Sequence, residues 1–254
     1  MATTTFDMVR PRARPRFYVG MAAVFVLIAF GGFIPTYWAK VATGTFHGAP
    51  IYHLHGFVLF SWTLYYFAQT ALVATGRTYD HRNWGLLGIA LATAIGFTVI
   101  LAEITTMRAA DAAGYGDAAR RFEAVSFVGV IIFAALFTAS IVNIRRTEWH
   151  KRLMILAVIP MMHAAMARVF LTVLAPPHAS DGPPPPLFVT IPPGLTVDLL
   201  LVVAMVYDWR TRGRVHPAYL VGVPFVVASQ LLTPAIGAST VWMTTARALE
   251  GLMG

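Results

Sequence analysis

The chain has 254 residues, of which 57% are hydrophobic and 12% are charged, and its formal net charge is +8. The charged fraction is about half of that in soluble domains, and one core cannot hide this much apolar surface, so a water-soluble fold is excluded. The sequence contains no cysteine. Disulfides, thiolate metal sites, iron–sulfur clusters and cysteine nucleophiles are therefore excluded as well.

Seven apolar stretches follow one another along the chain, and each can cross a bilayer as a helix of about 20 residues. Because lipid offers no partner for an open strand edge, we expect an all-α polytopic membrane protein with seven transmembrane helices. In chain order the predicted spans are Phe17–Trp38, Tyr52–Thr75, Trp84–Ala102, Ala124–Ile144, Leu153–Leu174, Ile191–Tyr207 and Ala218–Ser239. Residues 17–245 are expected to form a single membrane domain between a basic N-terminal tail, 1–16, and a short C-terminal tail, 246–254.

Thirteen of the 19 Lys and Arg residues lie in four short stretches that alternate with these spans. The stretches are Arg10–Arg16, Arg77–Arg82, Arg145–Arg152 and Arg210–Arg214. Cytoplasmic loops retain an excess of Lys and Arg, so the pattern predicts a bacterial inner-membrane protein with a cytoplasmic N-terminus and a periplasmic C-terminus. These residues lie in loops and not on one face, so we expect contacts with anionic lipid of the bilayer and none with nucleic acid.

The segments between the spans on the predicted outer side are longer than those on the inner side. Residues 105–123 carry mixed charge, and residues 175–194 are rich in proline. The proline-rich segment is not expected to form regular helix. It is either a stiff flap over the outer face or a simple connector.

An internal repeat relates two hairpins of the chain. Residues 77–82, RTYDHR, match residues 146–151, RTEWHK, and each copy leads into a span from the inner side. The repeat covers about 52–105 and 123–174, and it predicts a duplicated-hairpin, four-helix core formed by spans two to five. His81 and His150 occupy equivalent positions, so they either contact lipid headgroups or meet as a second candidate ligand pair.

Polar and ionisable side chains within spans are costly in lipid and mark candidate functional sites. The predicted orientation places five of them in the outer half of the bilayer or just beyond its midplane: His55, Glu103, His163, Arg168 and Asp198. Glu103, Asp198 and the amide of Gln69 are candidates for a polar pocket. Glu103 and Arg168 are also candidates for a structural ion pair.

Helical phase places His55, Trp62, Tyr66 and Gln69 on one face of the second span, which we expect to face protein. Pro160 removes a backbone donor and is expected to bend the fifth span just before His163. His55 and His163 are candidate axial ligands of haem b or, less favoured, of copper. Hydrogen bonds to neighbouring spans, or for His163 to a backbone carbonyl, are the alternative.

Two cofactor classes are excluded by the sequence. A retinal protein needs a lysine within a span, and the only lysines, Lys40 and Lys151, are interfacial or in loops. No nucleotide-binding glycine motif is present, neither a P-loop nor a dinucleotide fingerprint.

The pieces His53-Leu54-His55-Gly56, Gln69, His81-Arg82-x-x-Gly85 and Trp149-His150-Lys151-Arg152-Leu153-Met154 resemble uncharacterised bacterial inner-membrane families. Those families begin helices with HR-x-x-G and H-[RK]-R-L-M, and some are associated with assembly of haem-copper oxidases. In plan the duplicated hairpin is similar to haem A synthase. The resemblance implies a four-helix core and a role near respiratory assembly.

Three functions follow as hypotheses. The first is a redox or cofactor-handling protein with haem b between His55 and His163, a propionate at Arg168, and Trp62 and Tyr66 against the ring. The second is a non-redox binding protein or proton-coupled transporter for a small molecule. The third is an accessory or assembly subunit that binds other subunits of a membrane complex. Whether the protein is an enzyme is left open.

Overall fold

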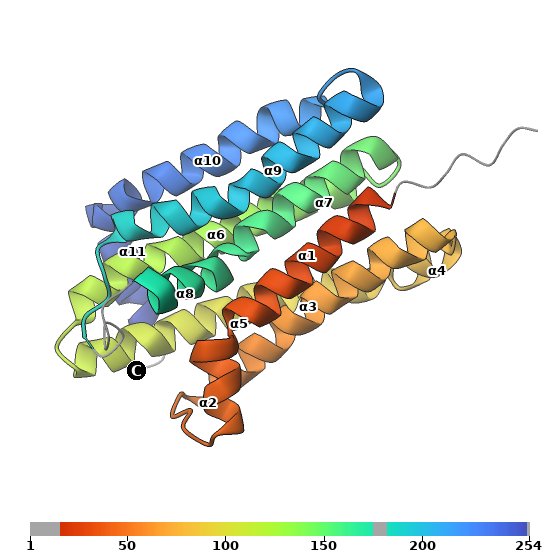
Figure 1. The fold of residues 1–254 in the computed structure, drawn as a ribbon. Coiled ribbons are helices and arrows are strands. Elements are labelled where there is room, and N and C mark those ends of the chain that lie inside the picture. The colour runs from red at the N-terminus through yellow and green to blue at the C-terminus, as the bar shows by residue number, and fades with distance from the viewer. Residues whose placement is uncertain (1–15, 175–181, 253–254) are drawn as a thin grey trace, which may run out of the picture.

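The computed structural model describes residues 16–174 and 182–252, and the regular structure within those ranges is helical (Figure 1). Seven helical segments in these ranges are long and apolar enough to cross a membrane. They are Phe17–Ala42, Pro50–Thr75, Gly85–Ala112, Gly116–Val142, Thr147–Leu174, Leu187–Arg212 and Pro217–Ala238. The prediction of an all-α polytopic membrane protein with seven spans is confirmed, and such a protein contacts the lipid bilayer.

Several spans consist of more than one helix. The elements in order are α1 (Phe17–Gly32), the π-helical η1 (Ile34–Trp38), α2 (Ala39–Ala42), α3 (Pro50–Thr75), α4 (Thr78–Asn83), α5 (Gly85–Ala112), α6 (Gly116–Val142), α7 (Thr147–Met161), α8 (His163–Leu174), the 3-10 turn η3 (Leu187–Thr190), α9 (Ile191–Arg212), α10 (Pro217–Ala238) and α11 (Thr240–Gly251). The fifth span is broken at Met162, so the predicted effect of Pro160 is confirmed.

The helices extend further than hydropathy predicts. The mixed-charge segment 105–123 is helical apart from residues 113–115, where Gly114 adopts a φ of 84° that favours glycine. The charged residues of this segment lie on helical turns that extend α5 and α6 beyond their apolar stretches. The position of the charged residues alone therefore does not predict where a helix ends. Residues 246–251, expected in a tail, lie within α11.

The proline-rich segment departs from the prediction in a similar way. Residues 187–190 form η3, and α9 starts at Ile191 with prolines in its first turn. Proline is tolerated there because the first amides of a helix have no acceptor within it. Residues 175–181 of the proposed flap lie outside the described residues.

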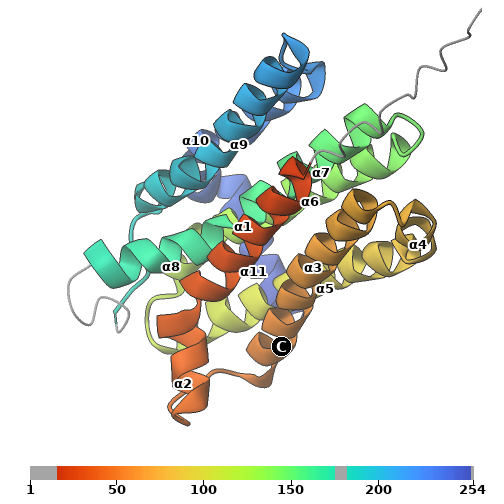
Figure 2. The same ribbon diagram turned by 45° about the vertical axis from the view of Figure 1, so that its right-hand side comes forward.

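The helices pack as one bundle (Figures 1 and 2). The four predicted core spans pack in chain order, α3 on α5, α5 on α6 and α6 on α7. The first helix, α1, lies between α3 and α8 and packs on both (Figure 2). The α9–α10 hairpin covers α6, α7 and α8, and the amphipathic α11 packs across α5 and α6.

The connections at residues 76–84, 143–146 and 213–216 lie together at one end, here called the basic end. His81 contacts His150 across it, and Trp149 contacts His216. The repeat is visible in the backbone, since Arg77 and Arg146 both leave the helical conformation just before a new helix starts. The first copy then breaks again at Trp84, whereas the second continues as α7.

Candidate functional site

Two glutamates from neighbouring helices meet within the membrane domain. Glu103 lies on α5 and Glu123 on α6, and the tight turn at 113–115 brings them to a similar level. Their carboxyl groups are within side-chain hydrogen-bonding reach of each other, and the Ser126 hydroxyl donates to Glu123 Oε2 at 3.4 Å. The Glu123 residue is only 6% exposed. Two like charges in contact repel each other where little water screens them, so a proton held between two carboxyl groups relieves that repulsion.

An arginine and a histidine complete this group. The Arg168 guanidinium on α8 lies 4.3 Å from the ring centroid of Phe33, and its Nη1 donates to the Ala164 carbonyl at 3.1 Å. Electrostatic interactions connect Arg168 with both glutamates, and His55 on α3 with Glu103 and Arg168. We call these residues, His55, Glu103, Glu123 and Arg168, the acid–arginine cluster.

The acid–arginine cluster was only partly visible in the sequence. Its residues His55, Glu103 and Arg168 were singled out by depth, whereas Glu123 directly precedes the predicted fourth span and was not a candidate site residue. Glu123 could have been found from its distance to the turn at 113–115, because Glu103 and Glu123 lie a similar number of residues before and after that turn.

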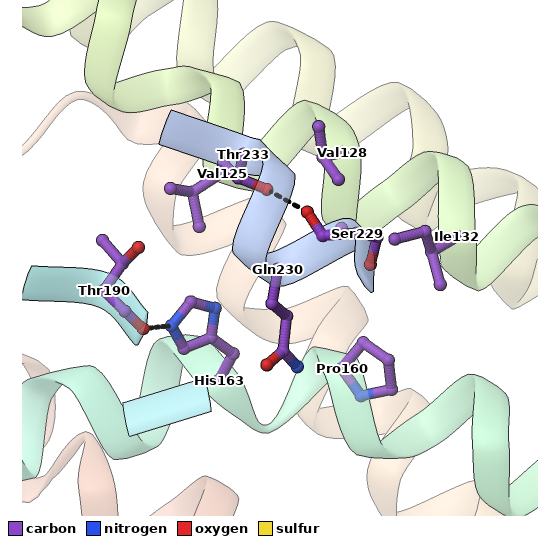
Figure 3. Close-up of a pocket in the computed structure, with 10 residues that line it drawn as sticks. Val125, Val128, Ile132, Pro160, His163, Thr190, Ser229, Gln230 and Thr233 are labelled. Carbon is purple, nitrogen blue, oxygen red and sulfur yellow. Dashed lines mark hydrogen bonds between the residues drawn. The ribbon is translucent and has the colours of Figure 1, made fainter. Parts of the chain in front are cut away.

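His163 lies in a different region, beside η3 and α10. Its Nε2 donates a hydrogen bond to the Thr190 carbonyl at 2.7 Å (Figure 3). The ring lines a small cavity of about 30 Å³, together with Pro160, Thr190, Gln230 and residues of α6 (Figure 3). This space holds a water molecule but no larger ligand.

Asp198 of α9 belongs to this second region. Gln230 Nε2 donates to its Oδ1 at 3.3 Å, and the Asp198 residue is 7% exposed. Within the described residues, Asp198 Oδ2 and Gln230 Oε1 are buried without a hydrogen-bond partner. These orphaned oxygens face the α9–α10 contact, where a bound water or proton would satisfy them.

The two predicted haem ligands are therefore in separate surroundings. Across residues 16–174 and 182–252, no hydrogen bond or ring contact joins His55 with His163, and α1 lies between their helices. Trp62, fully buried, packs on Phe133 and Phe137 with ring centroids 5.3 and 5.4 Å away.

The predicted polar pocket of Glu103, Asp198 and Gln69 does not form one site. Glu103 is in the acid–arginine cluster and Asp198 faces Gln230, whereas Gln69 lies near the basic end beside His81. The physical reason is distance along α3, because Gln69 is fourteen residues, roughly 21 Å, from His55. The predicted face of α3 does point into protein, since Trp62, Tyr66 and Gln69 are buried.

The basic end contains an ion network that sequence reasoning missed. Arg152 Nε donates to Asp208 Oδ2 at 2.6 Å, its Nη2 contacts Oδ1, and both side chains are fully buried. Arg152 Nη1 also bonds Glu148 at 2.7 Å, and Arg212 and Lys151 contact the same carboxylate. We call these five residues the basic-end ion network. The signal for it was an acidic residue, Asp208, at a helix end that is otherwise basic.

The repeat-related histidines meet at the basic end, with ring centroids 6.3 Å apart. His150 Nδ1 lies 2.9 Å from Ser140 Oγ and 3.1 Å from the Ser140 carbonyl. In the described structure, His81 Nδ1 is buried without a partner, and burial lowers the pKa of His81. Burial therefore favours the neutral form of the His81 ring.

Comparison with protein families, with curated proteins and with solved structures finds no match for this chain. Its function is therefore inferred from the geometry of its own residues.

Proposed function

We propose that this membrane protein binds, and moves in a proton-coupled manner, a small anionic solute at the acid–arginine cluster. The observation that supports the proposal is the contact between the Glu103 and Glu123 carboxyl groups within the spans, with Arg168 nearby. Ionisable residues at such positions are costly and are typical of proton relays and substrate sites.

The chemistry of the cluster couples a proton to an anion. When the two glutamates share one proton, the remaining negative charge balances Arg168. A second proton neutralises both carboxyl groups and leaves the guanidinium without a counter-charge. Its face is fixed on Phe33, and its N–H groups can then bind a carboxylate in bidentate fashion.

A spectroscopic experiment tests the shared proton without knowledge of the solute. Infrared difference spectra of the purified protein, recorded while pH is changed, report the C=O stretch of a protonated carboxylic acid. The band is expected to be lost in Glu103→Gln and in Glu123→Gln, and to persist in the control Glu250→Gln, whose carboxylate binds Arg120 at 2.6 Å. A band that persists unchanged in both cluster variants rejects the shared proton.

A flux experiment tests the coupling. Vesicles containing the protein and a pH-sensitive dye are exposed to a panel of small monocarboxylates. Wild-type protein is expected to acidify the lumen with at least one of them, and Glu103→Gln is expected to abolish this movement. Equal fluxes in the wild type, Glu103→Gln and protein-free vesicles would reject transport.

Binding of haem b or copper is the second candidate, and one observation favours it. His55 Nδ1 is buried and lacks a partner within the described residues, so a ligand could satisfy it. His163 fits less well, because its Nε2 is occupied by the Thr190 carbonyl, whereas ligating histidines commonly give Nε2 to the metal. Absorption spectra of oxidised and dithionite-reduced protein, with metal analysis, decide the question. A Soret band lost in His55→Ala supports haem, and colourless, metal-free protein rejects both cofactors.

We also propose that the basic end faces the cytoplasm of a bacterial inner membrane, which places the acid–arginine cluster in the outer half. The Arg residues of the three connections support this orientation. The chain has no native cysteine, so single cysteines can be introduced at Arg145, at the basic end, and at Ala113, at the opposite end. Membrane-impermeant maleimide on intact cells is expected to label only the second. Labelling of Arg145→Cys alone would invert the topology.

A further inference from the structure

We propose that His81 and His150 form a binding site for a borderline transition-metal ion of the Zn²⁺ class at the basic end. The site lies at the other end of the bundle from the acid–arginine cluster and does not depend on the function proposed for that cluster. It uses the two histidines that the internal repeat makes equivalent.

The distance between the rings fits one shared ion. Zinc binds imidazole nitrogen at about 2.0–2.1 Å, so two rings on one ion have centroids roughly 5 to 6.5 Å apart, depending on the angle at the metal. The observed separation is 6.3 Å, with an interplanar angle of 69°. The observed separation lies at the upper end of this range, so side-chain torsions must change for both rings to hold one ion at a tetrahedral angle.

The surroundings of each ring leave one nitrogen available. A carbonyl can only accept a hydrogen bond, so the Ser140 carbonyl fixes the proton of His150 on Nδ1 and leaves a lone pair on Nε2. A second atom, Ser140 Oγ, lies 2.9 Å from the same nitrogen, and the hydroxyl also donates to the His150 carbonyl. Metal-bound histidines characteristically hold their second nitrogen in this way.

His81 has the complementary arrangement. Its ring interacts with the backbone carbonyl of Gln69, while Nδ1 is buried and without a partner in the described structure. A buried nitrogen lone pair without a donor is costly, and a metal ion would satisfy it. Gln69 itself is buried, with 7% of the residue exposed, and its Oε1 also has no partner within the described residues.

The charges nearby restrict the class of ion. Arg82 acts electrostatically on His81, whereas Lys151, next to His150, is neutralised by Glu148 at 2.8 Å. A positive neighbour opposes any cation. Hard ions are disfavoured further, because they depend on carboxylate ligands and the two proposed ligands are imidazole nitrogens. Imidazole nitrogens suit zinc, copper and nickel, for which the bond to nitrogen is strong.

Calorimetric titration of the full-length protein in lipid nanodiscs with Zn²⁺ tests the site, and Co²⁺ serves as a coloured probe. We expect one ion per chain, and His81→Ala and His150→Ala are each expected to lower affinity at least about tenfold. The matched control is His47→Ala, which removes an exposed histidine from the loop after α2. Ser140→Ala tests positioning: it removes the Oγ contact but keeps both ligands and the Ser140 carbonyl, so it is expected to weaken binding less than either histidine variant does.

A measurement on the unmodified protein covers the case in which the variants fail to fold. X-ray absorption at the zinc edge counts imidazole ligands directly, and two are expected. No binding by the wild type, unchanged affinity in both histidine variants, or fewer than two imidazoles would each overturn the site.

Discussion

The basic-end ion network and the acid–arginine cluster both hold ionisable side chains away from water, but they arrange the charges differently. At the basic end, each buried charge touches a group of opposite sign, as Arg152 does with Asp208 and Glu148. In the acid–arginine cluster, two carboxyl groups touch each other and the arginine lies on an aromatic ring. Paired opposite charges hold helices in place, whereas paired like charges require a proton or a ligand. From this comparison we expect a structural role for the basic-end ion network, and we assign the proposed function to the acid–arginine cluster.

The largest effect is expected from breaking the basic-end ion network. Asp208→Ala leaves Arg152 buried without its bidentate partner, and removal of one member of a buried pair costs about 3–5 kcal/mol. Thermal unfolding in detergent measures this loss. The double variant Arg152→Met, Asp208→Leu is the control, since it removes both charges and is expected to recover most of the stability. An Asp208→Ala protein as stable as the wild type would show that the pair is not structural.

A much smaller stability effect is expected from the acid–arginine cluster. Glu123→Gln removes a carboxyl group from a like-charge contact and keeps an acceptor for Ser126. The free energy of unfolding is therefore expected to change by less than about 1 kcal/mol, while the proton-dependent signal is lost. The same unfolding and infrared measurements report both quantities. A loss as large as that of Asp208→Ala would make Glu123 a structural residue and remove the contrast between the two regions.

The sequence predicted the features that depend on one helix at a time. The seven spans, the break before His163 and the buried face with Trp62 follow from hydropathy, proline chemistry and helical phase. The repeat also placed His81 and His150 as equivalents, and their rings do meet.

Lateral packing set the limit of these predictions. The position of α1 between α3 and α8 separates His55 from His163, and no periodicity within α1 specifies its neighbours. The partner of Arg152 is 56 residues away, on α9. Such contacts arise from the arrangement of whole helices, which short motifs do not encode.

The smallest effect concerns a residue that lies against the basic-end ion network but outside the spans. His216 Nδ1 accepts a hydrogen bond from the Ala218 amide at 3.1 Å and so caps the N-terminus of α10. Burial, and then the positive charge of Arg152, lower the pKa of His216. Below pH about 6.5 the unfolded chain takes up this proton more readily than the folded one, so stability falls as pH falls toward the lowered pKa.

A protonated His216 cannot accept this bond, and loss of an N-cap costs about 1 kcal/mol. His216→Asn is the matched variant, because asparagine caps helices well but does not titrate. Unfolding temperatures measured between pH about 7.5 and 5 are expected to fall less steeply for His216→Asn than for the wild type. Equal slopes would assign the acid sensitivity to groups other than His216.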